Sequence, residues 1–395
     1  MPEPPTRREY PAAAVIATVM ACAAVAQAFG RFTWGVVLPD ARDDVLGGSN
    51  TLAGLLGTLN VAAYLLGTFA AAVIASRRSL TQMLRRGLML SFTGLTVMWL
   101  VPHPAVMGLS LFTMGLGGAL IWIPSPALAA RRMPPRLQGM AAGLVGSGIG
   151  IGIVFSGQLA AAFRDPERLD TWRSVYRVES AIGAVVLLLA FVVLRSRGET
   201  VSARGGIGGF QSLRRVPGWA PLTACYTAYG FAYLLVIAFL VARLEDDAGL
   251  SPDTASAVFS VLGVAIVVGG LSVGAAAGRF GVRATLMTGS AVFGACTLLM
   301  LTGSSPWIWV AAVGLGTMFS GVPASIATHI VQTASDADYG PAFSAATLAF
   351  GVAQMLGPQV GGALADATGS FTAVFLLSAG FSATGVIAAY MLPRR

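Results

Sequence analysis

Twelve long apolar blocks, separated by short polar or Pro/Gly-rich breaks, follow one another along the chain. Blocks of this length can cross a hydrocarbon core of about 30 Å at about 1.5 Å per helical residue. Six lie in the first half, at residues 11–38, 51–76, 84–101, 105–130, 138–163 and 178–195. Six more lie at residues 219–242, 254–277, 282–303, 306–333, 341–365 and 371–392. The pattern predicts an all-α integral membrane protein with 12 transmembrane helices.

Landmarks of the first half recur in the second at a spacing of about two hundred residues, as a duplicated transporter fold would produce. Asp43-Asp44 matches Asp246-Asp247, and Gly152…Gly157 matches Gly357…Gly362. We therefore expect two pseudo-symmetric six-helix halves, residues 1–195 and 219–395. Between them, residues 196–218 form a basic, glycine-containing segment that we interpret as a cytoplasmic linker.

The composition fits lipid surroundings, since 55% of residues are apolar and only 11% are charged. A soluble domain needs more charge to hydrate its surface. All 25 basic residues are arginine, and they lie mainly in connections between blocks, which argues against nucleic acid as a partner. With a cytoplasmic N-terminus, 18 arginines fall inside and six outside. By the positive-inside rule we expect both termini to be cytoplasmic. We further expect a monomer in a bacterial inner membrane.

No enzyme chemistry is visible in the sequence. Cys22, Cys225 and Cys296 lie inside apolar blocks with no metal-ligand spacing, and His103 and His329 are far apart in sequence. Nothing resembles a catalytic triad, a phosphate loop or a paired-carboxylate site. We expect neither catalysis nor a metal or cofactor.

The segment from Gly274 to Arg283 resembles the cytoplasmic gating motif of the major facilitator superfamily, with Gly278 in place of the usual acid. Its first-half copy is reduced to Ala75-Ser76-Arg77-Arg78. The resemblance covers nearly the whole chain. It implies a secondary transporter that moves a small solute by alternating access, with Arg279 and Arg283 at a gate.

Two further motifs narrow the resemblance. Gly152 belongs to a segment similar to the glycine motif of family antiporters, but Ile153 replaces its proline, which disfavours drug/proton antiport. In the second half, Gly357-Pro358 has the proline that the first-half copy of this glycine motif lacks. We assign Gly152, Gly357 and Pro358 to helix packing and gating. The Gly30-Arg31-Phe32 segment, with an aromatic stretch from Tyr229 to Tyr233, resembles a little-characterised bacterial branch of the superfamily.

Arg31 is the sharpest clue to the solute, because a guanidinium inside a span costs about 3 kcal/mol and needs an acceptor. It either snorkels to the outer headgroups or faces the cavity and binds an anion. No acid is evident in the first five spans to neutralise it. Helical spacing and depth suggest the other candidate solute-binding residues: Gln27, Asn60, Tyr64, Trp122, Tyr226, Tyr229, Tyr233 and Gln354.

Proton coupling needs a titratable group within the membrane. Glu179, Asp366 and His329 lie near the ends of predicted spans, and we interpret them as interfacial residues. Uniport, anion exchange and proton-coupled movement all remain open.

Three functions are compatible with these observations. Arg31 favours a carrier for a small organic anion such as a carboxylate. The alternative is an efflux pump for hydrophobic or drug-like compounds. A third is a transporter-like sensor without flux.

The orientation is testable with reporter fusions. Fusions at Gly206 and at the C-terminus should report the cytoplasm, and a fusion at Gly47 should report the periplasm, because of the arginine distribution and the even number of spans. A periplasmic signal at Gly206 would rule out the six-plus-six arrangement.

Overall fold

The computed structural model describes residues 10–75, 79–134, 138, 140–165, 167–194 and 209–393, and this part of the chain is helical without a β-strand. The helices of the first half are α1 (Ala12–Ala23), η1 (Ala24–Phe32), α2 (Thr33–Val45), α3 (Asn50–Ala75), α4 (Leu80–Leu100), α5 (Pro104–Trp122), α6 (Ser125–Ala130), α7 (Ala141–Phe163), η3 (Leu169–Thr171) and α8 (Trp172–Val193). Those that follow are α9 (Gly209–Arg215), α10 (Trp219–Ala242), η4 (Arg243–Asp247), α11 (Pro252–Phe280), α12 (Val282–Met300), α13 (Trp307–Thr333), α14 (Asp336–Thr368) and α15 (Thr372–Tyr390).

Every predicted span coincides with one helix or with a continuous group of helices. Within the described residues, ten spans are long and apolar enough to cross a membrane. The two predicted spans outside that set are α4, which carries Arg85 and Arg86, and the glycine-rich α14. The all-helical membrane fold is confirmed, and the count of 12 spans stays a prediction.

Some predicted helix ends are wrong because polar residues continue the helix. The first span runs through Pro39 to Val45 instead of ending at Leu38, and α8 begins at Trp172 instead of residue 178. Most charges in these extensions are paired, and Arg177, which has no ion pair among the described residues, is exposed, so they do not end the helix. In the predicted linker, α9 and residues up to Gly218 are described, and residues 196–208 and the Arg77-Arg78 pair lie outside the described residues.

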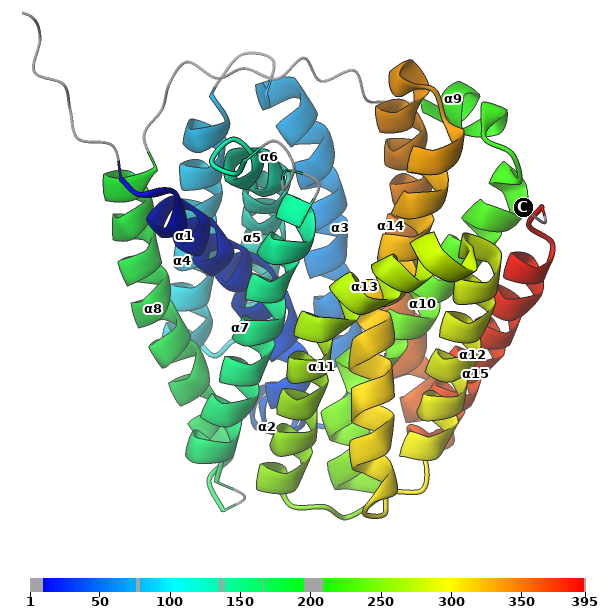
Figure 1. Cartoon of the computed structure of the whole chain (residues 1–395). Helices are drawn as coiled ribbons and strands as arrows, with labels where there is room; N and C mark the ends of the chain where they lie inside the picture. The colour runs from blue at the N-terminus through cyan, green and yellow to red at the C-terminus, as the bar shows by residue number, and fades with distance from the viewer. Residues whose placement is uncertain are drawn as a thin grey trace, which may run out of the picture.

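The two halves repeat one packing pattern. In the first, α4 packs on α5 and α8, and α3 packs on α5; in the second, α12 packs on α13 and α15, and α11 packs on α13. The halves meet where α3 contacts α14, α7 contacts α11, and α2 contacts α10. Figure 1 shows the two bundles side by side, diverging toward the end where α1 begins and α15 ends.

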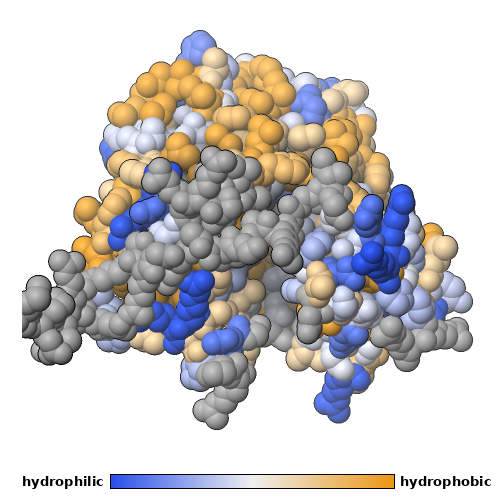
Figure 2. Space-filling model, turned by 90° about the horizontal axis from the view of Figure 1, so that it is seen from above, coloured by the Kyte–Doolittle hydropathy of each residue, from blue (hydrophilic) through white to orange (hydrophobic). Residues whose placement is uncertain are grey.

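Large apolar side chains point outward around both bundles. Leu109, Leu188, Val268 and Ile387 are each more than half exposed. Such a surface is unfavourable in water and matches contact with lipid tails. Figure 2 looks onto the end nearest the termini, where hydrophilic side chains stand out and hydrophobic ones occupy much of the periphery.

Glycines bring the halves into contact at the opposite end, which we call the closed end. It comprises residues 40–50, 164–165, 167–172, 243–251 and 366–371. Near it, a side chain on Gly54 or Gly57 would meet Pro358, and one on Gly157 would meet Ser260. The halves therefore touch backbone to backbone there.

Toward the termini the two bundles diverge (Figure 1). A Cβ added at Gly146, Gly278 or Gly340 would meet nothing within 4 Å, as is also true of Gly47 and Gly369 at the closed end. The two glycines assigned to gating pack inside their own halves: Gly152 lies against Ala24 and Ala28, and Gly357 lies against Phe231 and Leu234. Their surroundings agree with the packing role, whereas Pro358 lies directly on the interface between halves.

Replacing Gly54 with leucine should push α3 away from α14, because the new side chain would overlap the Pro358 backbone. We expect a lower melting temperature in detergent and a wider closed end, measured by spin-label distances. Gly380→Leu is the matched control, since a Cβ there meets nothing within 4 Å. Equal stability and equal distances in both variants would contradict this account of the interface.

Candidate functional site

Arg31 lies deep within the first span. The helix continues 14 residues beyond it, to Val45, so Arg31 lies about 20 Å from that end at about 1.5 Å per residue. The predicted depth was only half as great, because the span was expected to end at Leu38. An arginine side chain cannot bridge this distance to the headgroups at that end. Arg31 also belongs to the π-helical segment η1, a rare geometry frequent at functional sites.

A neutral amide and two aromatic rings lie against the guanidinium of Arg31. Its Nη2 donates to Oε1 of Gln354, which α14 brings from the opposite half. The rings of Tyr64 and Phe32 lie 5.3 and 5.5 Å from the guanidinium carbon. Its Nε is buried without a partner, and no acidic side chain among the described residues pairs with it. The positive charge therefore has no opposite charge beside it.

Four of the predicted residues surround Arg31 and define, with it, the central polar cluster. The side chain of Gln27 lies beside Tyr64, and that of Gln354 lies beside Tyr233. Both tyrosines interact electrostatically with Arg31. The cluster draws on η1, α3, α10 and α14, so it can form only when both halves are in contact.

Aromatic rings cover the side of this cluster that belongs to the second half. Phe350 stacks on Tyr226 with ring centroids 4.1 Å apart and on Tyr233 at 5.8 Å, and Tyr233 meets Phe319 edge-on at 5.2 Å. The hydroxyl of Tyr229 donates to the carbonyls of Met318 and Phe319. Two tyrosines of α10 therefore have different surroundings. Tyr229 is hydrogen-bonded to α13, whereas Tyr233 faces Arg31.

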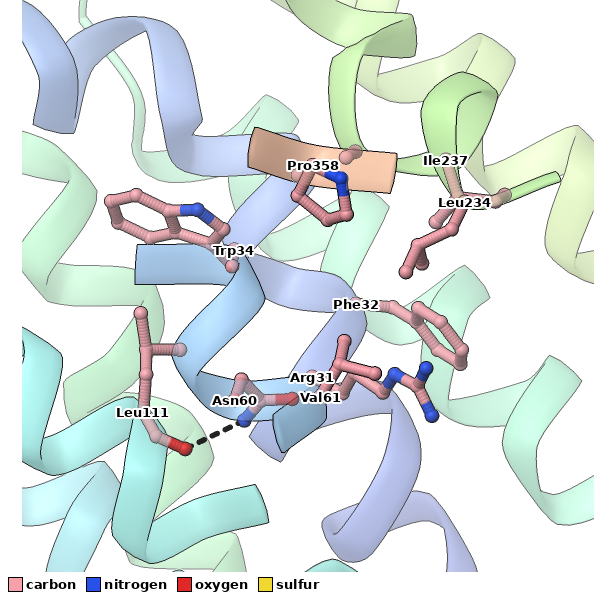
Figure 3. A pocket seen from close by; sticks show the side chains of 12 residues that line it. Arg31, Phe32, Trp34, Asn60, Val61, Leu111, Leu234, Ile237 and Pro358 are labelled. Carbon is pink, nitrogen blue, oxygen red and sulfur yellow. Dashed lines mark hydrogen bonds between the residues drawn. The ribbon is translucent and has the colours of Figure 1, made fainter. Parts of the chain in front are cut away.

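A small cavity of about 30 Å³ lies beside Arg31, large enough for a water or two. Asn60 lines it, but its amide donates to the carbonyls of Gly30 and Leu111, at 2.9 and 2.7 Å. In Figure 3 Asn60 turns toward Leu111 while the guanidinium of Arg31 points the other way. The side chain of Asn60 therefore links η1 to α5 by hydrogen bonds. Trp122, the last residue of α5, does not line this cavity.

Ion pairs that the sequence pattern does not predict join the halves at the closed end. Arg164, whose side chain is fully buried, binds Asp40 at 2.6 Å and Glu245 of the second half at 2.7 Å. Arg42 pairs with Asp246 across the same boundary. The repeated Asp43-Asp44 and Asp246-Asp247 were the only sequence signal, since Asp40, Arg164 and Glu245 resemble ordinary loop charges.

A carboxylate and a helix N-terminus form another contact between the halves. Asp366, near the end of α14, accepts from the backbone N–H groups of Asn50 and Thr51, at 3.0 and 2.8 Å. These N–H groups begin α3 and lack partners within the helix. Asp366 therefore has a structural role at the closed end.

The sequence matches the family described as "Uncharacterised MFS-type transporter YbfB" over residues 23–391. The chain belongs to this family of major facilitator transporters. No curated protein matches it.

Solved structures of other major facilitator transporters share the fold. A bacterial homologue of the human lysosomal transporter Spinster, inward-facing and unoccupied, has a TM-score of 0.73 at 17% identity, covering 96% of this chain and 95% of its own. For the nucleoside transporter NupG the TM-score is 0.75 at 14% identity, with 96% and 98% covered. For the E. coli fucose:proton symporter FucP it is 0.61 at 16% identity, with 97% and 100% covered.

The major facilitator gating motif lies at the end away from the ion pairs. Arg279 stacks on Phe280 with its guanidinium carbon 5.4 Å from the ring centroid, and Arg283 stacks on Tyr390 at 4.6 Å. Neither forms an ion pair with a described residue. Their gating role stays a prediction.

Two groups interpreted as interfacial are buried instead. Glu179 is fully buried and lies seven residues inside α8, because this helix starts earlier than predicted. His329 is also buried, with Nε2 2.9 Å from the carbonyl oxygen of Pro217. Glu179 thus lies deeper in its helix than predicted, whereas His329 lies four residues before the end of α13, near the predicted span end.

Removing the buried cation of the closed end should weaken it. Arg164→Gln leaves Asp40 and Glu245 close together without a cation, and breaking such a buried network costs about 3–5 kcal/mol. We expect a lower melting temperature and faster labelling of cysteines introduced at the closed end. Arg168→Gln is the control, because its ion pair with Asp170 is exposed. Labelling of Arg164→Gln at the rate of the control would show that the ion pairs do not hold this end shut.

Proposed function

We propose that this major facilitator transporter carries a small organic anion, such as a monocarboxylate, and that Arg31 binds its charged group. The observation that most supports this proposal is that the Arg31 guanidinium lies in the middle of the membrane without an acidic partner among the described residues. A carboxylate offers two oxygens to a guanidinium in matching geometry. Binding would supply the opposite charge that the described residues lack.

The surroundings of Arg31 suggest the rest of the solute. Tyr64, Tyr233, Gln27 and Gln354 offer donors and acceptors beside the charge. Phe350 and the Tyr226 ring stacked on it provide an apolar wall. We therefore propose a solute with one anionic group and a compact apolar body, in line with sites that combine few polar groups with an apolar lining.

The contact between halves supports alternating access. Arg31 and Gln354 belong to different halves, so separating the halves on either side of the cluster would change the solute contacts. The ion pairs join the halves at the closed end, while the two bundles diverge toward the other end (Figure 1). We propose that the protein lies in a bacterial inner membrane with its termini in the cytoplasm, so that the closed end faces the periplasm.

Efflux of hydrophobic or drug-like compounds is the second candidate. The aromatic wall favours it, since stacked rings bind many apolar compounds and cations. The positive charge of Arg31 at the same place opposes cationic drugs.

A thermal-shift screen of the purified protein distinguishes the two. Carboxylates, with benzoate as the first probe, should raise the melting temperature, and sugars and cationic drugs should not, since a ligand stabilises the state it binds. Binding of the best carboxylate should then weaken about ten- to a hundredfold in Arg31→Gln, because hydrogen bonds to a charged group contribute about 1.5–3 kcal/mol. Arg31→Lys should weaken it less, since the charge remains.

Arg86→Gln is the matched control, because Arg86 is exposed on α4. It should bind carboxylates as the unmodified protein does. Wild-type affinity in a folded Arg31→Gln variant would refute the anion site, and stabilisation by cationic drugs alone would favour efflux.

A further inference from the structure

Glu179 is a buried carboxyl group that the central polar cluster does not use. Its Oε1 lies 2.7 Å from the hydroxyl oxygens of both Thr33 and Ser156. Its Oε2 is also buried and has no hydrogen-bond partner among the described residues. The hydroxyl of Tyr176, one turn earlier on α8, is buried and unpartnered as well. The ionised carboxylate thus has one oxygen that no donor contacts.

No cation among the described residues faces this carboxyl from the helices packed against it, and on α8 itself Arg173 pairs with Asp44 while Arg177 is exposed. The α1 and α7 helices carry no charged residue. On α4, Arg85 binds carbonyls at the far end of α8, and Arg86 is exposed. Arg31 on η1 is directed to Gln354, the charges of α2 belong to the closed end, and Asp170 on η3 is exposed. An ionised carboxylate surrounded only by hydroxyls costs several kcal/mol, which binding a proton removes.

The hydroxyls around Glu179 can serve both of its protonation states. The Thr33 hydroxyl also lies 3.3 Å from the carbonyl oxygen of Ala28, and that of Ser156 lies 3.1 Å from the carbonyl oxygen of Gly152. When the carboxylate is ionised, both hydroxyls can donate to it. When it is protonated on Oε1, the carboxyl can donate to one hydroxyl while the hydroxyls turn to the backbone carbonyls. The site therefore accepts and releases a proton without leaving a hydroxyl unpaired.

The same two hydroxyls connect Glu179 to the parts that must move. Thr33 directly follows η1, and its alternative acceptor, Ala28, lies within that segment, three residues before Arg31. Ser156 precedes Gly157, which packs against Ser260 of α11 in the second half. A change of hydrogen bonds at Glu179 therefore reaches the turn that presents Arg31 and the interface between halves.

We propose that Glu179 is a proton-exchange site of the transport cycle, coupled through Thr33 to the π-helical turn that carries Arg31. The step forms one O–H bond on the carboxylate and later breaks it, with release of the same proton, so no other reactant is required. It makes the protein a proton-coupled carrier. The exchange itself does not depend on which solute Arg31 binds.

Infrared difference spectroscopy on the protein in liposomes tests this without a solute. Lowering the pH from mildly alkaline to mildly acidic should produce a carbonyl band of a buried protonated carboxyl that shifts in heavy water. The band should be absent in Glu179→Gln and present in Glu167→Gln, a matched control because Glu167 is exposed. In Thr33→Val the band should remain but change frequency, since the carboxyl loses a hydrogen-bond partner.

Three results would overturn the proposal. The first is a band that persists in Glu179→Gln. The second is a band of equal intensity at every pH, because the carboxyl would then be a permanently protonated packing group. The third is a band that keeps its frequency in Thr33→Val. Should Glu179→Gln fail to fold, the Thr33→Val frequency and the pH dependence of the unmodified protein still decide. Because no solute is present, none of these outcomes tests the proposed anion site at Arg31.

Discussion

The charge of Arg31 is the constraint on which the central architecture depends. A guanidinium in the middle of a membrane needs acceptors, and here a neutral amide from the opposite half and two aromatic rings provide them. This arrangement holds the charge in place without cancelling it, as an acidic partner would. A permanently paired arginine would have to exchange one carboxylate for another to bind an anion, whereas this one offers an unpartnered Nε.

The duplicated fold explains how the acceptors reach Arg31. The first half lies against the second where α2 contacts α10 and α3 contacts α14, so Gln354 and Tyr233 arrive from the second half. The buried Arg164 network holds the halves together at one end, and its charges are satisfied only while that end is closed. The polar contacts thus depend on the relative position of two rigid bundles, which is the requirement for a carrier.

Much of this was accessible from the sequence, because periodicity and depth decide which side chains share a level in the membrane. Arg31, Gln27, Tyr64, Tyr233 and Gln354 were predicted together and lie together. The ion pairs around Arg164 were missed because charges at helix ends look like loop charges until a partner far along the chain is known. Glu179 was misplaced for the same reason: neighbouring arginines suggested a helix end where α8 in fact continues. The π-helical geometry of η1 leaves no sequence pattern at all.

The central claim is that the charge of the solute, held by Arg31, is what the site recognises. The most direct measurement compares, by calorimetric titration, the carboxylate that stabilises the protein most with its primary amide, which has nearly the same shape and no charge. The account predicts that the carboxylate binds at least ten times more tightly and that Arg31→Gln removes this difference. Equal affinity for the acid and the amide in the unmodified protein would contradict it.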